Sequence, residues 1–460
     1  MTNQEKELWQ EIQDKPYCDP TKRMDFVLFF DVRDGNPNGD PDAGNLPRMD
    51  PQTRHGIVTD VCIKRKIRDY LATLKDEQDK PLCSIYIQSQ AALNTLYFQG
   101  ARKIAKDEPE NDVDTSAEEK KRRNQDKEAV AALLVELDTE NSEFKALIAI
   151  PENRGGGQSE QVNSTISTDE QAHFRDWLAS IDVDGLEFDP ECGTLSYLGE
   201  ANNKDKFKKL LSLDEFVPDP WNQEIDKLAR LLNDAKPKKS AQERRAREAV
   251  KRKMCELYDD IRLFGGVLTA GTNAGQIRGP MQLTFARSVE PILQMDAAIT
   301  RCAITTASDF AKKQTEFGRK PWLNWAVYRQ HGFFNPLLGR SREQDGTGIT
   351  KEDLARFWEA LACMFRNSDS ASKGEMTMHD IIVFVHGHPR GNAPSHVLFD
   401  KIKCESIKYD GKNADNQKDN NNTVIKRDGF DECYTISVGA KSSGKVEVHR
   451  PLRDIWTISD

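Results

Sequence analysis

Oxygen-bearing side chains follow an apolar run near the N-terminus, where they could hold a metal ion. Residues 34–40 (DGNPNGD) match the first half of a calcium loop, in which alternate positions supply oxygen ligands around a glycine turn. The second half does not match, because position twelve is Asn45 where such loops carry a bidentate glutamate. The sequence therefore predicts no calcium site, and we expect neither a metal nor a cofactor.

Four histidines, His379, His386, His388 and His396, could supply imidazole ligands to a metal. No HExxH, HNH-like or DxD-like setting accompanies them, and no Ser/His/Asp or Cys/His signature is present. His386 ends an apolar run, where a hydrogen-bonded structural histidine is the expected role. The sequence thus predicts no catalytic site.

Glycines are frequent in residues 265–279, together with Thr, Asn, Gln and Arg278. A nucleotide-hydrolysing P-loop is excluded, because no Lys-Ser/Thr pair follows the required glycine. Two interpretations remain open for this segment. The glycines could let a polymer backbone approach main-chain N–H groups, or they could form simple turns between strands.

Basic side chains give a better signal. Lys64, Arg65 and Arg68 are predicted to share one face of a helix. A second group lies later in the chain beside aromatic residues such as Phe285, Phe317 and Trp322, and consists of Arg278, Arg287, Arg301, Arg319 and Lys320. This combination suits neutralisation of a nucleic-acid backbone with stacking or wedging of bases.

The charge of the chain is unevenly distributed. The 460 residues carry a formal net charge of -9, yet residues 101–250 alone hold 23 basic and 33 acidic side chains. Residues 251–340 hold 13 basic and 7 acidic side chains. A polyanion could therefore bind the later segment in spite of the acidic average.

The length and composition indicate a water-soluble protein of two or three domains. No run approaches eighteen apolar residues and no export signal opens the chain, so membrane insertion is not expected. Nine widely spaced cysteines without a CxxC pair indicate reduced thiols in the cytoplasm.

The elements that must position these residues can be read from hydrophobic patterning. We expect strands over residues 25–31, 281–286 and 381–386, an extended segment over 321–334, and amphipathic helices over 63–74 and 351–365, the second begun by Thr350. The order strand, helix, insertion, strand, strand, helix, strand is that of a ferredoxin-like α+β domain with material inserted after the first helix.

Five ordered blocks resemble a known family. They are FFDVRDGNPNGDPDAGNLPRMDPQT, HGIVTDVCIKRKIRDY, GQIRGPMQLTFARSVEPI, FGRK, and SASKGEM followed by an IVF strand and GNAPSH. Together they resemble the backbone subunit of the type I-C CRISPR Cascade complex, a Cas-seven member of the RAMP superfamily. The resemblance covers residues 24–95 and 255–405, and residues 101–250 lie outside it.

The resemblance implies an RRM-like palm (residues 1–100 and 251–460) with a fingers region and a thumb at about residues 290–320. The acidic, partly helical insertion at 101–250 would enlarge the fingers. It also implies a non-enzymatic subunit that polymerises along CRISPR RNA and leaves guide bases free to pair with target DNA. The RNA-binding residues implied are Thr59, Lys64, Arg65, Arg68, Arg278, Gly279, Arg287, Arg301, Arg319 and Lys320.

The implied partners are further copies of the chain, a Cas-five-type subunit, a large and a small subunit, and a recruited nuclease-helicase. Relatives in type III systems cut RNA with a loop aspartate, and Asp34 and Asp40 lie in the corresponding loop. A metal-dependent endoribonuclease that uses these aspartates or the histidines is therefore the alternative hypothesis.

Overall fold

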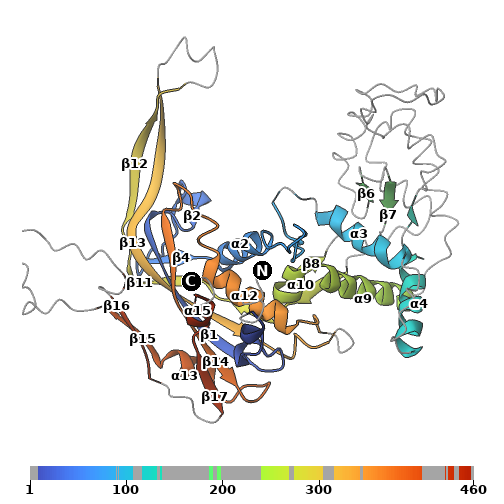
Figure 1. The fold of residues 1–460 in the computed structure, drawn as a ribbon. Helices are drawn as coiled ribbons and strands as arrows, with labels where there is room; N and C mark the ends of the chain where they lie inside the picture. The colour runs from blue at the N-terminus through green and yellow to red at the C-terminus, as the bar shows by residue number, and fades with distance from the viewer. Residues whose placement is uncertain are drawn as a thin grey trace, which may run out of the picture. The chain divides into compact units, whose positions relative to one another are not determined.

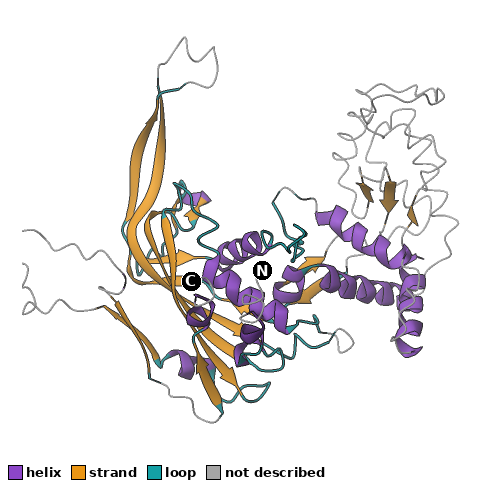
Figure 2. Ribbon diagram, in the orientation of Figure 1, coloured by secondary structure: helices purple, strands orange, loops and turns teal. Residues whose placement is uncertain are grey.

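The computed structural model describes residues 9–89, 91, 93–106, 117–131, 135–136, 186–189, 194–197, 240–268, 274–303, 315–341, 346–406, 430, 434–439 and 445–456. The chain divides into two compact units. Unit 1 consists of Met1–Ile85, Arg262–Phe264 and Gly279–Asp460, and unit 2 of Tyr86–Ile261 and Gly265–Arg278. Figure 1 traces the chain through both units, and Figure 2 separates their helices from their strands.

Unit 1 is built on an antiparallel sheet with the order β17-β14-β1-β13-β11-β4, to which β10 and β12 add by pairing with β13. Its strands are β1 (Met24–Gly35), β4 (His55–Val58), β10 (Met281–Leu283), β11 (Ala286–Pro291), β12 (Gln294–Arg301), β13 (Glu316–Phe334), β14 (Glu375–His386) and β17 (Val446–His449). The two long neighbours of β1 follow it for most of its length, so β1 is the centre of the sheet.

Both faces of β1 are covered, which explains its nearly continuous apolar sequence. On one face, Phe26 and Phe30 belong to a core shared with α2 (Asp60–Leu71) and α12 (Lys351–Cys363). On the other face, Val27 and Phe29 belong to a second core with α13 (Ser395–Phe399), β15 (Ile402–Ser406) and β16 (Tyr434–Val438). The alternation of side chains along the strand thus supplies two separate apolar layers.

Helix α12 has a complete start signal. Thr350 Oγ1 accepts a hydrogen bond from Asp353 N at 3.1 Å, and Asp353 Oδ2 accepts one from Thr350 N at 2.9 Å. This reciprocal pair satisfies two backbone donors at the helix start. Asp353 also receives two hydrogen bonds from Arg262, at 2.8 and 3.0 Å, and therefore ties α12 to α10 (Asp259–Phe264).

Unit 2 has its own apolar core. The helices α3 (Leu93–Lys106), α4 (Ala117–Ala131) and α9 (Ser240–Leu257) pack together, and Tyr97, Val130, Val250 and Met254 are buried among them. The unit also holds the hairpin of β8 (Gly265–Leu268) and β9 (Gly275–Arg278), and a small sheet of β5 (Val135–Glu136), β6 (Leu186–Asp189) and β7 (Thr194–Tyr197).

Several smaller elements complete the described part of the chain. They are the 3₁₀ turns η1 (Pro16–Cys18) and η2 (Pro41–Ala43), the strands β2 (Gly39–Asp40) and β3 (Leu46–Pro47), and α15 (Pro451–Trp456). None of the helices in the described ranges is long and apolar enough to cross a membrane.

The predicted strands at 25–31 and 381–386, the extended segment at 321–334 and the helix begun by Thr350 are confirmed. The predicted helix over 63–74 is α2, which ends earlier, at Leu71. The single strand predicted over 281–286 is wrong, because β10 ends at Leu283 and β11 begins at Ala286. Between them Thr284 N donates to His331 O, so the two short strands pair with separate parts of β13.

Candidate nucleic-acid interface

The loop after β1 is held against the turn that precedes β14. Asn36 N donates to Ser372 O at 2.8 Å, and Lys373 Nζ donates to Pro37 O at 3.2 Å. A Cβ added to Gly35 would lie 1.9 Å from the carbonyl oxygen of Lys373, so glycine is required for this close approach of two backbones. Residues 34–50 and the turn at 370–374 are thereby brought together.

Thr59 joins the start of α2 to the same loop. Its backbone N and its Oγ1 both donate to Asn38 Oδ1 at 3.0 Å, and Oγ1 accepts from Cys62 N at 3.4 Å. The hydroxyl is therefore used as both donor and acceptor, and Thr59 is the N-cap of the helix. The contact with RNA expected for Thr59 stays a prediction beside this structural role.

Three basic side chains from three segments gather near Cys62, and we call Arg48, Lys66 and Lys373 the loop cluster. Burial raises the pKa of the Cys62 thiol, and the three cations of the loop cluster act in the opposite direction. Burial also lowers the pKa of Lys66, whose Nζ donates to Ser368 Oγ at 2.7 Å. The loop cluster concentrates positive charge where the loop, α2 and the 370–374 turn meet.

The single basic face expected for Lys64, Arg65 and Arg68 is not present. Lys64 pairs with Asp60 at 2.9 Å and Arg65 with Asp69 at 2.7 Å, each one turn away along α2. Arg68 is only 8% exposed, and its guanidinium lies 5.2 Å from the ring centroid of Phe264. Helical periodicity gave the direction of Arg68 but not the ring of α10 that covers it.

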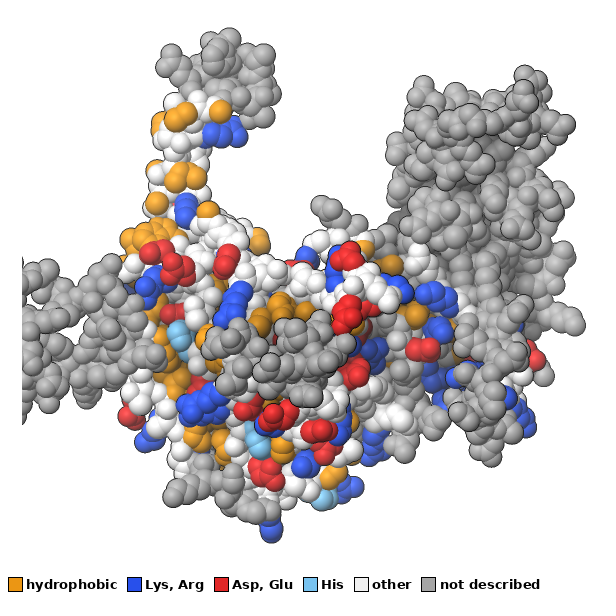
Figure 3. Space-filling model, viewed as in Figure 1, with side chains coloured by type: hydrophobic (Ala, Val, Ile, Leu, Met, Phe, Trp, Pro, Cys, Tyr) orange, Lys and Arg blue, Asp and Glu red, His pale blue; other side chains and the backbone are white. Residues whose placement is uncertain are grey.

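A long hairpin extends from the sheet, formed by β12 and the first half of β13 (Figure 1). Its register runs from Gln294 opposite Leu323 to Arg301 opposite Glu316. Large apolar side chains are exposed along it, with Leu293 at 75%, Ile299 at 50% and Phe317 at 79%. Apolar surface of this kind, alternating with basic side chains in Figure 3, indicates a surface that meets a partner.

The basic residues predicted on this hairpin are indeed there, with acidic neighbours. Arg319 is 83% exposed and pairs with Asp296 at 3.0 Å. Arg301 pairs with Glu316 directly across the hairpin, and Lys320 lies opposite Ala297. Exposed pairs of this kind are weak in water, so the cations can exchange a carboxylate for a phosphate at small cost.

The remaining predicted residues are spread over both units. Arg278 is an exposed residue at the end of β9 in unit 2, whereas Gly279 is buried at the start of the next segment of unit 1. Arg287 in β11 is exposed and pairs with Asp50 at 3.0 Å. This hydrogen bond holds the pKa of Asp50 below its usual value. Arg287 thus lies at the end of the loop that carries the loop cluster.

Comparison with known sequences decides the family. The family of CRISPR-associated protein Cas7 matches residues 22–139 and 203–426, which is well over half of the chain. This chain belongs to the Cas7 family. A curated relative, CRISPR-associated protein Cas7 of Haloferax volcanii, is 49% identical over 49 residues. That match spans 11% of this chain and only 14% of the relative's length.

Two solved structures are also similar to this Cas7 family chain. A chain of a CRISPR RNA-guided surveillance complex in a pre-nicking state is 13% identical, with a TM-score of 0.32, and the match covers 85% of this chain and 86% of that one. A chain of a second CRISPR RNA-guided surveillance complex is 11% identical, with a TM-score of 0.28 and coverage of 85% and 84%. At these scores the likeness carries no argument of its own.

The aspartates and histidines considered for catalysis are separated in this Cas7 family member. Asp34 is exposed, and Asp40 pairs with Arg48 at 3.3 Å. His379 lies 3.0 Å from Asp31, and His386 lies 3.2 Å from Asp25 in the core. Within the described ranges, no three His, Cys, Asp or Glu side chains are grouped in a way that could hold a metal ion.

Sequence reasoning missed the loop cluster. Arg48, Lys66 and Lys373 come from three distant segments, and only the antiparallel pairing of β1 with β14 brings the 370–374 turn to the loop. A weak signal was available, because the GNPNGD and SASKGEM segments each combine glycine with polar residues beside a predicted strand. Their meeting could not be read from local patterns.

Proposed function

We propose that this Cas7 family chain is the CRISPR RNA-binding backbone subunit of a type I-C Cascade complex. Copies of the chain would polymerise along the guide RNA and present its bases for pairing with target DNA. The observation that carries the proposal is the family match on both sides of the insertion. The type I-C assignment rests on the five sequence blocks of residues 24–95 and 255–405.

The palm of the proposed subunit is a ferredoxin-like domain. In support, the central strands run in the order β14-β1-β13-β11, with α2 following β1 and α12 lying between β13 and β14 in the chain. Numbered by their place in a βαββαβ unit, these strands have the order 4-1-3-2. Both helices share one apolar layer with β1, as such a domain requires.

The thumb and fingers are assigned within the same proposal. The exposed hairpin at residues 294–323 lies where the thumb was expected, and its side chains Phe317, Ile299 and Met295 could wedge between bases. Unit 2 would be the enlarged fingers region. The expected limits of the insertion, 101 and 250, fall inside α3 and α9, so we place the fingers at the limits of unit 2 instead.

Guide phosphates would be neutralised by the loop cluster together with Arg65, Arg287 and the hairpin cations. Each of these side chains is at least partly exposed except Lys66, which reaches the surface through Ser368. The partners of the proposed subunit are a Cas-five-type protein, a large and a small subunit and a recruited nuclease-helicase. We place the complex in the cytoplasm and assign no catalytic role to this chain.

Light scattering of the full chain on RNA tests the proposal. On RNAs of 30, 60 and 90 nucleotides, the complex should gain protein mass in equal steps, because each copy occupies a fixed length of RNA. Substituting Phe317→Ser and Ile299→Ser should abolish this stepwise growth, while Leu337→Ser and Val397→Ser replace equally exposed apolar residues elsewhere and should leave it intact. A mass independent of RNA length would contradict the proposal.

The same preparation tests the endoribonuclease alternative. We expect RNA to stay intact for hours with Mg²⁺ or Mn²⁺, because the described carboxylates and histidines do not converge on one site. Cleavage at regular intervals that is lost on Asp34→Ala or Asp40→Ala would establish the alternative.

A further inference from the structure

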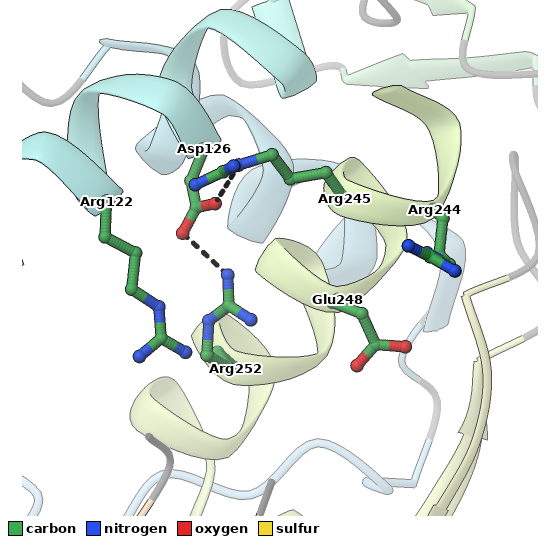
Figure 4. Close-up of a pocket in the computed structure, with 6 residues that line it drawn as sticks. All are labelled: Arg122, Asp126, Arg244, Arg245, Glu248 and Arg252. Atoms are coloured by element: carbon green, nitrogen blue, oxygen red, sulfur yellow. Dashed lines mark hydrogen bonds and ion pairs between the residues drawn. The ribbon is translucent and has the colours of Figure 1, made fainter. Parts of the chain in front are cut away.

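Unit 2 contains a pocket lined only by charged side chains. Helices α4 and α9 form its walls, and the pocket has a volume of about 370 Å³. It is lined by Arg122, Asp126, Arg244, Arg245, Glu248 and Arg252 (Figure 4). On α9, Arg245, Glu248 and Arg252 follow each other at the three- and four-residue spacing that aligns side chains on one face.

Positive charge exceeds negative charge in this pocket. Asp126 accepts from Arg245 at 3.0 Å and from Arg252 at 2.6 Å, so one carboxylate serves two guanidinium groups (Figure 4). Glu248 pairs with Lys251 at 3.2 Å, which removes its charge from the pocket arginines. Among the described residues, Arg122 and Arg244 have no carboxylate partner.

The excess extends along both helices beyond the pocket. Helices α4 and α9 together contain eleven Lys or Arg and seven Asp or Glu, although residues 101–250 as a whole are strongly acidic. The acidity of the insertion therefore lies elsewhere, and the helix pair is locally basic. The average charge of the insertion hides a surface suited to anions.

We propose that this arginine pocket binds backbone phosphates of a nucleic-acid strand. The site goes beyond the proposed function, whose guide contacts are assigned mainly to the loop cluster and the hairpin of unit 1. Arg122 and Arg244 would make the direct phosphate contacts, because Arg presents a planar fork of donors that matches phosphate oxygens. Asp126 would hold Arg245 and Arg252 in position.

The lining favours a nucleic-acid strand over other anions. An acidic protein partner would need apolar surface at the centre of its interface, and all six lining side chains are charged. A small polyphosphate needs only the pocket, whereas the basic residues continue along α4 and α9. A repeating phosphate backbone makes use of both features.

Salt-dependent binding of the full chain to labelled oligo(dT) of 30 nucleotides tests the inference. Arg122→Gln with Arg244→Gln should lower the slope of log K against log salt by about 1.4, since each single-strand phosphate contact contributes about 0.7. Arg390→Gln with Lys401→Gln removes equal charge from exposed positions of unit 1 and should leave the slope unchanged. Arg122→Lys with Arg244→Lys should retain most of the slope, because a point charge still contacts phosphate.

Three outcomes would overturn the inference. They are an unchanged slope in the Gln variant, an equal loss in the Arg390 and Lys401 control, or displacement of the oligonucleotide by oligo-glutamate but not by unlabelled DNA. Displacement by micromolar inorganic triphosphate would assign the pocket to a small anion and also contradict it. Melting temperatures verify folding of each variant. Stepwise growth on RNA in the Gln variant would show that the proposed function stands whether or not this inference fails.

Discussion

At the scale of single residues, equal charges have unequal roles in this chain. Arg68 and Lys373 are both basic residues close to the proposed RNA surface, but Arg68 is buried over Phe264 while Lys373 is half-buried beside the loop. Residue type and helical spacing identified the first, and only tertiary contacts identify the second. The structure therefore separates cations that support the fold from cations available to phosphates.

This separation predicts opposite phenotypes. Arg68→Ala should lower the free energy of unfolding by about 1–2 kcal/mol, because it removes a buried stem and a cation–π contact. Arg48→Ala with Lys373→Ala should leave stability nearly unchanged and lower the salt slope of RNA binding by about 1.4. Chemical denaturation and binding of two unrelated RNAs across a salt series measure both. A loss confined to one RNA would contradict a phosphate role.

His331 predicts a pH dependence of stability. Burial and the nearby Arg329 lower its pKa to about 4, and its ring stacks on Phe399 at 4.2 Å between centroids. The unfolded chain binds the proton more tightly, so stability is complete above pH 6.5 and falls as the pH drops towards 4. Because the ring is partly exposed, we expect a loss of about 1–2 kcal/mol.

The variant His331→Phe keeps the stack and removes the titrating group. Its free energy of unfolding should fall less than that of the parent between pH 6.5 and 4, and it should be higher at pH 4. Denaturation at four pH values measures this difference. Identical pH dependence in the two proteins would assign the acid sensitivity to other groups.

At the scale of elements, local signals were sufficient where a helix or strand carries its own start. The Thr350 cap and the apolar run of β1 could be read directly from the sequence. The break between β10 and β11 could not, because Thr284 is diverted by His331 on a strand 47 residues away. The exposed side chains of the hairpin were likewise invisible until the pairing register was known.

Asp353 predicts that one residue can control a whole element. Its carboxylate completes the capping box of α12 and receives both hydrogen bonds from Arg262, and its side chain is only 2% exposed. Asp353→Ala should cost about 3–5 kcal/mol, since it leaves a guanidinium partly buried without its partner. Thr350→Ala should cost about 1 kcal/mol, and Thr350→Ser almost nothing. Equal losses for Asp353→Ala and Thr350→Ala in urea denaturation would contradict this ranking.

At the scale of the whole molecule, the limits of the insertion decide which deletion is tolerated. Removing residues 101–250 would cut α3 and α9 and expose Tyr97 and Met254, which are fully buried in unit 2. Sequence composition located the insertion but could not locate helices that cross its edges. Their contacts lie between segments more than a hundred residues apart.

Replacing residues 132–239 by a ten-residue Gly/Ser linker should therefore be tolerated. The flanking helices approach each other through Asp126 and Arg245, and a linker of this length can span roughly 33 Å. We expect cooperative unfolding and unchanged RNA affinity, measured by circular dichroism and filter binding. The 101–250 deletion is the matched comparison and should aggregate. Loss of cooperative unfolding in the shorter deletion would place residues 132–239 within a folding core.

The central claim, that this Cas7 family chain is built along a guide RNA, is tested most directly by what purifies with it. The full chain should be expressed with a CRISPR array and isolated at moderate salt, and its absorbance at 260 nm measured before the extracted nucleic acid is sized. The account predicts a discrete RNA of guide length that is sensitive to ribonuclease. Protein free of nucleic acid, or a smear of cellular RNA without a defined length, would contradict it.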